Sequence, residues 1–337
     1  MIKKLFIILA GVGLASQANA ACVIDLSTPD GGTTPTTLTT APLNITIDAG
    51  APADTTLFIP GAEANTSAQG TPVTYINCVT GELYGKETTA MLGANLGGGL
   101  FATNVDGIAI KPLWNNGGNP AFGKFPSQAP MSFSTPTGRF SYGPNSYFRI
   151  ELYKTKPTLT LNPGPNQVLP GGIIAYNWVS TTGIANFGQQ LQIGAINITS
   201  TPSCTFDSNK QVDFQLVTGA KLKAGVDRPL DFDITCITDY GHYSATAAIT
   251  TSTPSADGNY IKVRDSSGND DKMQIKISDS TGAQLPLNGS RSEQKVNIAS
   301  NAPAEFKWTA RLEPVSPTVS PSNGNFSAAA EIVLQVN

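Results

Sequence analysis

The residues around Trp114 have the side-chain types that a sugar-binding site needs. Amide and carboxylate groups hydrogen-bond neighbouring sugar hydroxyls, and an aromatic ring covers the apolar face of a pyranose. A protein ligand could use the same surface as an aromatic hot spot. The pattern therefore predicts a receptor-binding site. Its central residues are Trp114, Asn115, Asn116 and Asn119, and its outer residues are Asp106 and Tyr142.

A purely structural interpretation of this segment is equally open. Trp114 could be a core residue, and Asn115-Asn116-Gly117-Gly118 is the composition that a tight turn with positive φ requires. The stretch 111–147 has no regular alternation but contains several aromatic residues among Gly, Pro and Ser. A long loop of this kind in a compact domain is commonly functional, and the aromatic residues argue against disorder.

Catalytic and cofactor chemistry has little support in the sequence. His242 is the single histidine, so it would be the only histidine base for a triad. The glycines 97–99 lack the Lys-Ser/Thr of a phosphate loop, and no CxxC spacing suggests a metal. We predict a protein that is not an enzyme, with no cofactor and no metal. The alternative is a secreted β-sandwich hydrolase acting on glycans, with Asp48 and Glu151 as a converging carboxylate pair.

The N-terminus predicts export. Lys3 and Lys4 precede an apolar run over 5–14, and Ala18-Asn19-Ala20 has the small residues of a cleavage site. Residues 1–20 are therefore a predicted signal peptide, and the mature chain would begin at Ala21. No later stretch reaches the ~20 apolar residues that cross a bilayer, so no membrane insertion is expected.

The charge balance excludes some partners. Without the leader, 19 of the 21 basic residues remain against 24 acidic ones, which gives a formal charge of −5. Such a chain has no basic stripe for nucleic acid and no polybasic patch for anionic lipid. Charged residues make up only 13% of the sequence, while turn-forming residues are plentiful, which is typical of secreted β structure.

The elements that must position these residues are predicted to be strands in two domains, 21–199 and 200–337. The predicted mature chain, 337 minus 20 or 317 residues, exceeds the ~250 to 300 residues at which single cores stop growing. Cys22 and Cys78 fall in the first half and Cys204 and Cys236 in the second, so one disulfide in each domain is natural in an oxidising compartment. We expect an all-β fold with two immunoglobulin-like sandwiches.

Period-two alternation marks the candidate strands. In the first domain the apolar sets are Leu43/Ile45/Ile47, Ile108/Ile110, Phe148/Ile150/Leu152 and Ile174/Tyr176/Trp178. In the second they are Val212/Phe214/Leu216, Leu230/Phe232/Ile234/Cys236, Met273/Ile275/Ile277, Val296/Ile298 and Phe306/Trp308/Ala310/Leu312.

The last fourteen residues carry a resemblance to a known family. A glycine, Gly324, is followed by alternating apolar residues that run to the terminal carboxylate. This ending resembles the C-terminal motif of pilus subunits assembled by the chaperone-usher pathway, although Val336 stands where the family usually has an aromatic residue. The apolar face consists of Phe326, Ala328, Ala330, Ile332, Leu334 and Val336.

The resemblance implies a pilin domain that lacks its last strand. A hydrophobic groove then stays open until a periplasmic chaperone, and later the adjacent pilus subunit delivered at the outer-membrane usher, inserts a strand. The groove would be lined by Gly324, Phe326, Ala330, Ile332, Leu334 and Val336, and the Asn337 carboxylate would be available to a basic residue of the chaperone. The alternative is an ordinary closing strand of a complete sandwich.

The N-terminus adds a direction to this resemblance. Ala21 alone precedes Cys22, so no segment is available to donate a strand. In this family a subunit that only accepts is the fimbrial tip adhesin, whose extra N-terminal domain binds a host glycan or host protein. In the type 1 fimbrial adhesin the mature N-terminus helps to form the pocket, which makes Ala21 a further candidate. A minor adaptor pilin is the alternative within the same pathway.

Overall fold

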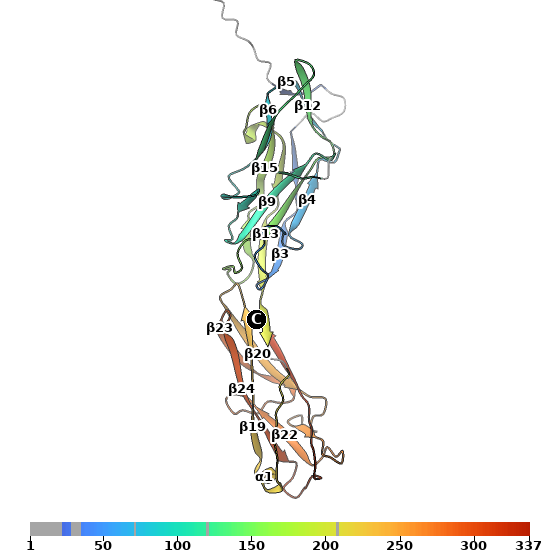
Figure 1. Cartoon of the computed structure of the whole chain (residues 1–337), viewed down its shortest axis with the longest axis vertical. Coiled ribbons are helices and arrows are strands. Elements are labelled where there is room, and N and C mark those ends of the chain that lie inside the picture. Colours follow the sequence, from blue (N-terminus) through green and yellow to red (C-terminus); the bar gives the residue numbers. More distant parts are fainter. Residues whose placement is uncertain (1–21, 28–34, 71, 119–120, 207–208) are drawn as a thin grey trace, which may run out of the picture.

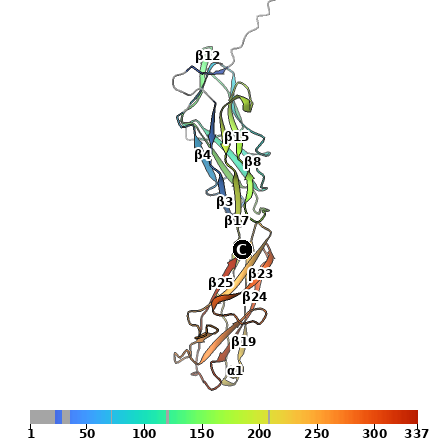
Figure 2. The ribbon, with the colours of Figure 1, turned by 180° about the vertical axis from the view of Figure 1, so that it is seen from behind.

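A computed structural model describes residues 22–27, 35–70, 72–118, 121–206 and 209–337. The predicted signal peptide, Ala21 and Asn119 lie outside these residues. The sheets fall into two groups that follow one another along the long axis of the molecule (Figure 1), and the view from behind shows the same end-to-end arrangement (Figure 2). We call them the first and second domains. The prediction of an all-β fold with two immunoglobulin-like sandwiches is confirmed.

Two large sheets build the first domain. One contains, in spatial order, β4 (Glu63–Ser67), β13 (Tyr147–Lys154), β9 (Ile108–Asn115), β8 (Leu100–Ala102) and β7 (Asn95–Gly97), with β10 (Gly123–Lys124) also paired to β9. The other contains β11 (Ser127–Pro130), β6 (Leu83–Thr88), β15 (Gly172–Val179), β16 (Phe187–Ile193) and β2 (Thr36–Thr39).

Two three-stranded sheets complete the first domain. One is ordered β1 (Val23–Ile24), β5 (Val73–Val79) and β12 (Thr137–Tyr142), and the other is ordered β14 (Asn166–Leu169), β17 (Ile196–Thr201) and β3 (Leu43–Asp48). A short 3₁₀ turn, η1 (Ile184–Asn186), precedes β16. The predicted disulfide between Cys22 and Cys78 is present and joins the start of β1 to β5.

The alternation in β13 shows how the sequence builds this domain. Successive side chains of a strand point to opposite faces. Phe148, Ile150 and Leu152 are therefore buried in the main core, whereas Tyr147 and Arg149 lie on the opposite face and are only partly buried. The core also contains Ile45 and Ile47 of β3, Ile108 and Ile110 of β9, and Ile174 of β15, which confirms the predicted strands.

One expectation about the first domain is wrong. The segment 111–147 is not a long unpatterned loop, because the end of β9, the whole of β10, β11 and β12, and the start of β13 fall within it. Phe125, from the same segment, is a core residue with 1% exposure. Glycine and proline between these short strands obscured the alternation, since they mark turns in the sequence without showing what the flanking residues pair with.

The second domain contains a five-stranded sheet and a three-stranded sheet. The first is ordered β18 (Ser203–Phe206), β19 (Val226–Ile237), β24 (Pro303–Pro314), β22 (Met273–Ser278) and β21 (Ile261–Val263). The second is ordered β23 (Asn288–Ala299), β20 (His242–Thr250) and β25 (Glu331–Val336). One helix, α1 (Gly219–Ala224), precedes β19, and no helix in the described residues is long and apolar enough to span a membrane.

Aromatic stacking fills the core of the second domain. The rings of Phe232 and Phe306 stack with centroids 5.0 Å apart, and Trp308 meets Phe232 edge-on at 4.8 Å. Trp308 is 1% exposed, and its indole N–H donates to Glu293 at 2.7 Å. The second predicted disulfide joins Cys204 to Cys236, where β18 pairs with β19.

Three details of the second domain differ from expectation. The segment around Val212, Phe214 and Leu216 forms no strand: Phe214 is buried in the core from irregular backbone, while Leu216 is 83% exposed. Val296 lies in β23 but is 60% exposed, after which Asn297 takes a positive φ of 57°. The last strand begins at Glu331 rather than at Gly324, and Ala328 and Ala330 are exposed.

A single residue separates the strands of the two domains. β17 ends at Thr201 and β18 begins at Ser203, so only Pro202 lies between them. The turn after β19 reaches back across this joint: the Asp239 carboxylate accepts from Leu159 N–H at 2.8 Å and from Ser200 Oγ at 2.6 Å. Tyr240 packs against the first core. The predicted division between 199 and 200 falls inside β17 and stays a prediction.

Candidate functional site

Trp114 and Tyr142 lie together in the structure. Trp114 is near the end of β9 and Tyr142 ends β12, and their rings meet edge-on with centroids 5.8 Å apart. Trp114 is only partly buried, and its indole N–H donates to Gln189 at 3.2 Å. Tyr142 is 2% exposed, and its hydroxyl donates to the Trp178 carbonyl at 2.8 Å. Burial and the nearby Tyr75 and Tyr84 hydroxyls raise the pKa of Tyr142 well above its ordinary value.

The other predicted residues of this site do not converge on Trp114. Asn115 is 1% exposed and shapes the turn after β9: its side-chain N–H donates to the Ala121 carbonyl at 2.9 Å. Its oxygen accepts from Gly117 N–H at 2.7 Å, and the Asn116 oxygen accepts from Gly118 N–H at 2.9 Å. Asp106 is exposed and pairs with Lys156. Asn119 and Ala21 lie outside the described residues. The side-chain hydrogen bonds of Asn115 and Asn116 described above therefore stabilise the turn.

A pocket of about 190 Å³ opens beside Trp114. It lies where β11 pairs with β6, with Ser127 opposite Lys86. Its lining residues are Tyr84, Gly85, Lys86, Trp114, Ser127, Gln128, Ala129 and Tyr142. The Lys86 ammonium stands 5.1 Å from the centroid of the Trp114 ring, and burial lowers the pKa of this lysine. Sequence reasoning missed Lys86 and Gln128 because the pairing of β6 with β11 is not visible in the sequence.

A second hollow, of about 410 Å³, lies on the outward face of β13 and its neighbour β4. Arg149 is held there between the rings of Phe58 and Phe122, at 5.1 and 5.6 Å. It also pairs with Glu63 at 2.5 Å and Glu151 at 2.8 Å, so its charge is already matched. The lining residues are Asn65, Thr66, Ser67, Phe122, Tyr147 and Arg149. The alternation of β13 was the signal that could have located this hollow, because Tyr147 and Arg149 share the face opposite Phe148 and Ile150.

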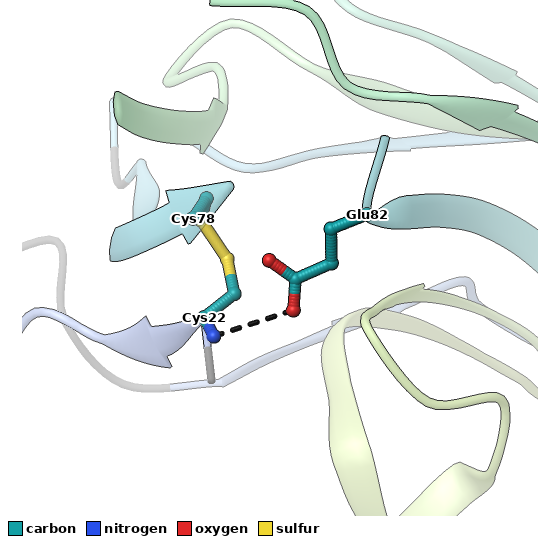
Figure 3. Close-up of side chains that lie close together, drawn as sticks. All are labelled: Cys22, Cys78 and Glu82. Atoms are coloured by element: carbon teal, nitrogen blue, oxygen red, sulfur yellow. Dashed lines mark hydrogen bonds between the residues drawn. A yellow bond between two sulfur atoms is a disulfide. The ribbon is translucent and has the colours of Figure 1, made fainter. Parts of the chain in front are cut away.

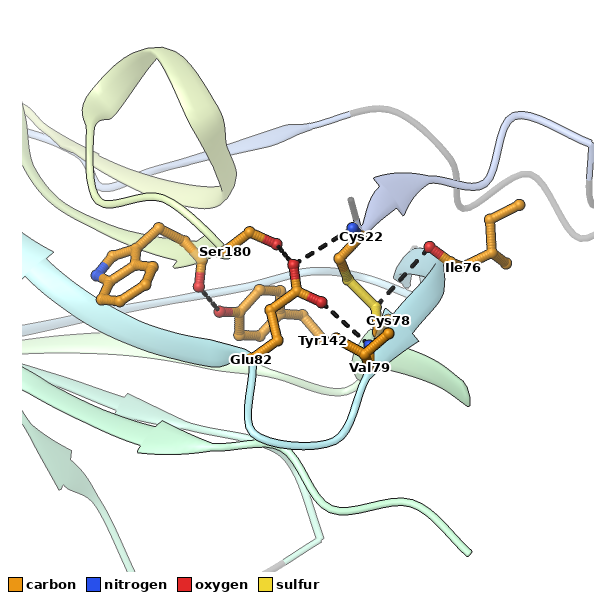
Figure 4. The surroundings of a disulfide bond; sticks show 8 residues. Cys22, Ile76, Cys78, Val79, Glu82, Tyr142 and Ser180 are labelled. Carbon is orange, nitrogen blue, oxygen red and sulfur yellow. Dashed lines mark hydrogen bonds between the residues drawn. A yellow bond between two sulfur atoms is a disulfide. The ribbon is translucent and has the colours of Figure 1, made fainter. Parts of the chain in front are cut away.

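Glu82 lies beside the first disulfide, and the three side chains of Cys22, Cys78 and Glu82 form a compact cluster (Figure 3). The two sulfurs are bonded to each other, so neither is a thiolate that could ligate a metal. Glu82 instead accepts from the backbone N–H of Cys22 at 3.3 Å and of Val79 at 3.1 Å, and it also bonds to the Ser180 hydroxyl (Figure 4). The cluster thus anchors the start of the described chain to β5 and β15.

The terminal strand β25 is an edge strand. It pairs with β20 alone, and no second strand flanks it among the described residues. Ile332, Leu334 and Val336 point toward the second core but remain only partly buried, whereas their neighbours Ala245 and Ala247 on β20 are 0% exposed. Phe326 also packs on this core, with its ring 6.3 Å from Phe214, and Gly324 takes a φ of +130°. The apolar residues of β25 therefore lie at an edge of the sheet where the second core is only partly covered.

The two carboxylates of the hydrolase alternative, Asp48 and Glu151, each bind other groups. Glu151 accepts from the Tyr153 hydroxyl at 2.5 Å and pairs with Arg149, so its oxygens are occupied. Asp48 ends β3 and accepts from Gly50 N–H at 2.8 Å. A glycosidase needs two carboxylates free to face one sugar bond. Both oxygens of Glu151 are instead held by Tyr153 and Arg149.

Residues 192–337 match the family model described as "Fimbrial protein". The match covers the whole of the second domain and less than half of the chain. This match confirms the resemblance drawn from the last strand. No curated protein matches the chain.

Solved fimbrial structures have a weaker likeness to this chain. The chaperone–tip adhesin pre-assembly complex CsuC–CsuE of Acinetobacter baumannii gives a TM-score of 0.41 at 12% identity, over 94% of this chain and 100% of that chain. The receptor-binding domain of the adhesin MrkD1P of Klebsiella pneumoniae gives 0.37 at 16% identity, over 52% and 96%.

Proposed function

We propose that this fimbrial protein is a two-domain tip adhesin, exported through the periplasm to the cell surface and assembled by the chaperone-usher pathway. The observation that carries the proposal is the fimbrial domain at 192–337 preceded by a complete additional sandwich with its own pockets. A shaft subunit needs only the domain that links it to its neighbours. The extra domain is therefore assigned to binding a host glycan or host protein.

The second domain joins the fibre by accepting a strand beside β25. Its unpaired edge and the partly buried Ile332, Leu334 and Val336 support this role, because an added strand gains backbone hydrogen bonds and covers apolar side chains at the same time. The donor would come first from a periplasmic chaperone and then from the adjacent subunit at the outer-membrane usher. The groove residues are Gly324, Phe326, Ala330, Ile332, Leu334 and Val336.

Co-purification with the chaperone tests the assembly half of this proposal. The full chain is produced in the periplasm with and without the cognate chaperone and is recovered through a tag on the chaperone. We expect a one-to-one complex, and rapid proteolysis of the chain when the chaperone is absent. If a chain truncated before Gly324 stays folded and protease-resistant, β25 lines no open groove.

Cell adhesion tests the receptor-binding half. Fimbriated bacteria carrying Trp114→Ala should bind host cells less than bacteria carrying Leu96→Ala, because Trp114 lines the smaller pocket and the exposed Leu96 lines neither. Equal fimbriation, counted by electron microscopy, shows that the variants assemble. Undiminished adhesion by the Trp114 variant would move the receptor site away from this pocket.

A further inference from the structure

The Lys86 ammonium is a partly buried cation that has no counter-charge among the described residues. Its side chain makes no hydrogen bond or ion pair with them, and it lies over the Trp114 ring. Other cations of this domain are satisfied in different ways. Arg149 and Lys156 pair with carboxylates, the buried Lys154 donates to three backbone carbonyls, and Lys111 lies over the Tyr153 ring outside both pockets. A charge removed from water is costly unless it is paired, and Lys86 differs from these cations in lining a pocket where an anion could pair with it.

The surroundings of Lys86 show what could pair with it. Its pocket is lined by the aromatic side chains of Tyr84 and Trp114 and by the polar groups of Ser127 and Gln128. Hydroxyl and amide groups of this kind hydrogen-bond sugar hydroxyls. At about 190 Å³ the pocket is smaller than the ~300–1,000 Å³ typical of sites for drug-sized ligands, so one sugar residue fits better than a longer chain.

We propose that this pocket binds the carboxylate of an acidic sugar residue through Lys86. A single negative charge on the ligand matches the single ammonium, and the aromatic and amide groups recognise the rest of the sugar. The inference deepens the receptor-binding part of the proposed function and rests on it. Because burial lowers the pKa of Lys86, a bound carboxylate would also favour the protonated form of the lysine.

Binding of matched acidic and neutral sugars to the full chain, purified with its chaperone, tests this proposal. The probes are sialyllactose, a glucuronic acid disaccharide and lactose, measured by calorimetry. We expect at least one acidic probe to bind at least tenfold more tightly than lactose, and the two acidic probes distinguish a sialic acid from a uronic acid. Equal binding of acidic and neutral probes, or no binding of either acidic probe, would overturn the proposal, as would N-acetylglutamate binding as tightly as the sugars.

Three variants separate the role of Lys86 from general stability. Lys86→Met keeps an unbranched apolar side chain of nearly the same length and removes the charge. It should weaken binding of the acidic probe at least tenfold without lowering the melting temperature. Lys111→Met is the matched control, since Lys111 also lies over an aromatic ring, that of Tyr153, but outside the pocket. Its binding should be unchanged. Unchanged binding by Lys86→Met would contradict the proposal.

Gly123 offers a variant that keeps the charge. A Cβ atom at Gly123 would lie 2.5 Å from Lys86 Nζ, so Gly123→Ala must displace the ammonium. The acidic probe should bind more weakly to this variant while lactose is unaffected. This variant decides the question if Lys86→Met does not fold. Chaperone co-purification stays intact in every case if only the sugar proposal fails, whereas its loss in the parent chain would show that the proposed function itself is wrong.

Discussion

Asp239 accepts a hydrogen bond of 2.6 Å from Ser200 Oγ, and this contact fastens the turn after β19 to the last strand of the first domain. Asp239 is 1% exposed, and its second carboxylate oxygen accepts from Leu159 N–H at 2.8 Å. Its backbone carbonyl accepts from Leu161 N–H at 2.8 Å. One residue of the second domain thus satisfies two separate segments of the first.

Replacing Asp239 with alanine should loosen the joint between the domains. The substitution leaves Leu159 N–H and Ser200 Oγ without partners, and an unsatisfied buried group costs about 1–3 kcal/mol. We expect a lower free energy of unfolding and a broader distribution of shapes in small-angle X-ray scattering. Asp231→Ala, at an exposed position of β19, is the control and should change stability by less than about 0.5 kcal/mol. An unchanged scattering profile for Asp239→Ala would show that the joint does not depend on this side chain.

Tyr75 should make the first domain sensitive to alkali. Burial raises the pKa of Tyr75 to about 12, while the unfolded chain has its ordinary value near 10. Between these values the unfolded state has lost the proton and the folded state has kept it, so stability falls as pH rises through this window, by up to about 1.4 kcal/mol per pH unit. Below pH 10 both states are protonated and the effect is absent. Urea unfolding at pH 9 to 12 should show a smaller decline for Tyr75→Phe.

At neutral pH, the variants Tyr75→Phe and Tyr142→Phe should differ in stability. The Tyr75 hydroxyl has no hydrogen-bond partner among the described residues, so its removal should be neutral or slightly stabilising. Tyr142→Phe loses a bond of 2.8 Å to the Trp178 carbonyl and should cost about 1 kcal/mol. Chemical denaturation at pH 7 compares the two. Equal losses would mean that the Tyr75 hydroxyl is satisfied in solution.

A pair of substitutions on β25 should distinguish its two faces. Leu334 points toward the second core and Val333 is 46% exposed on the other face. If a donated strand covers the core-facing side, Leu334→Ser should sharply reduce recovery of the chaperone complex, while Val333→Ser should leave it near the parent level. Pull-down through the chaperone measures both. Equal recovery of the two variants would contradict strand insertion at this edge.

Removing the first disulfide should destabilise the first domain. Cys22→Ala with Cys78→Ala opens the link between β1 and β5, and loss of a native disulfide from a secreted domain typically costs about 2–5 kcal/mol. Glu82→Gln is the comparison, because it keeps the disulfide and removes only the charge that accepts from Cys22 and Val79 N–H. We expect the double variant to unfold at a clearly lower denaturant concentration than Glu82→Gln.

Strands with strict alternation were predictable from sequence because their burial follows from local chemistry. Phe306, Trp308, Ala310 and Leu312 all face the second core, as the pattern indicates. Phe214 is the counter-example: it is buried without belonging to a strand, because an irregular segment can present one ring to a core as well as a strand can. The disulfides were predictable because each pair lies within one half of the sequence.

The candidate site was only partly predictable. Trp114 and Tyr142 were chosen because both are large aromatic residues of one segment, and the structure places their rings in contact. Lys86 was not chosen because its position over the Trp114 ring depends on strand pairing that the sequence does not show. Asn115 was placed at the site for its amide, but that amide is used by the turn after β9.

The joint at Pro202 has a mechanical consequence. Proline fixes its own φ angle. The residues on either side of it are both paired: β17 is paired through its last residue, and β18 from its first. A torque applied at the far end of the first domain, where β5 and β12 lie (Figure 1), has no swivelling linker to absorb it. We therefore expect sideways drag at that end to act on the hydrogen bond between Asp239 and Ser200.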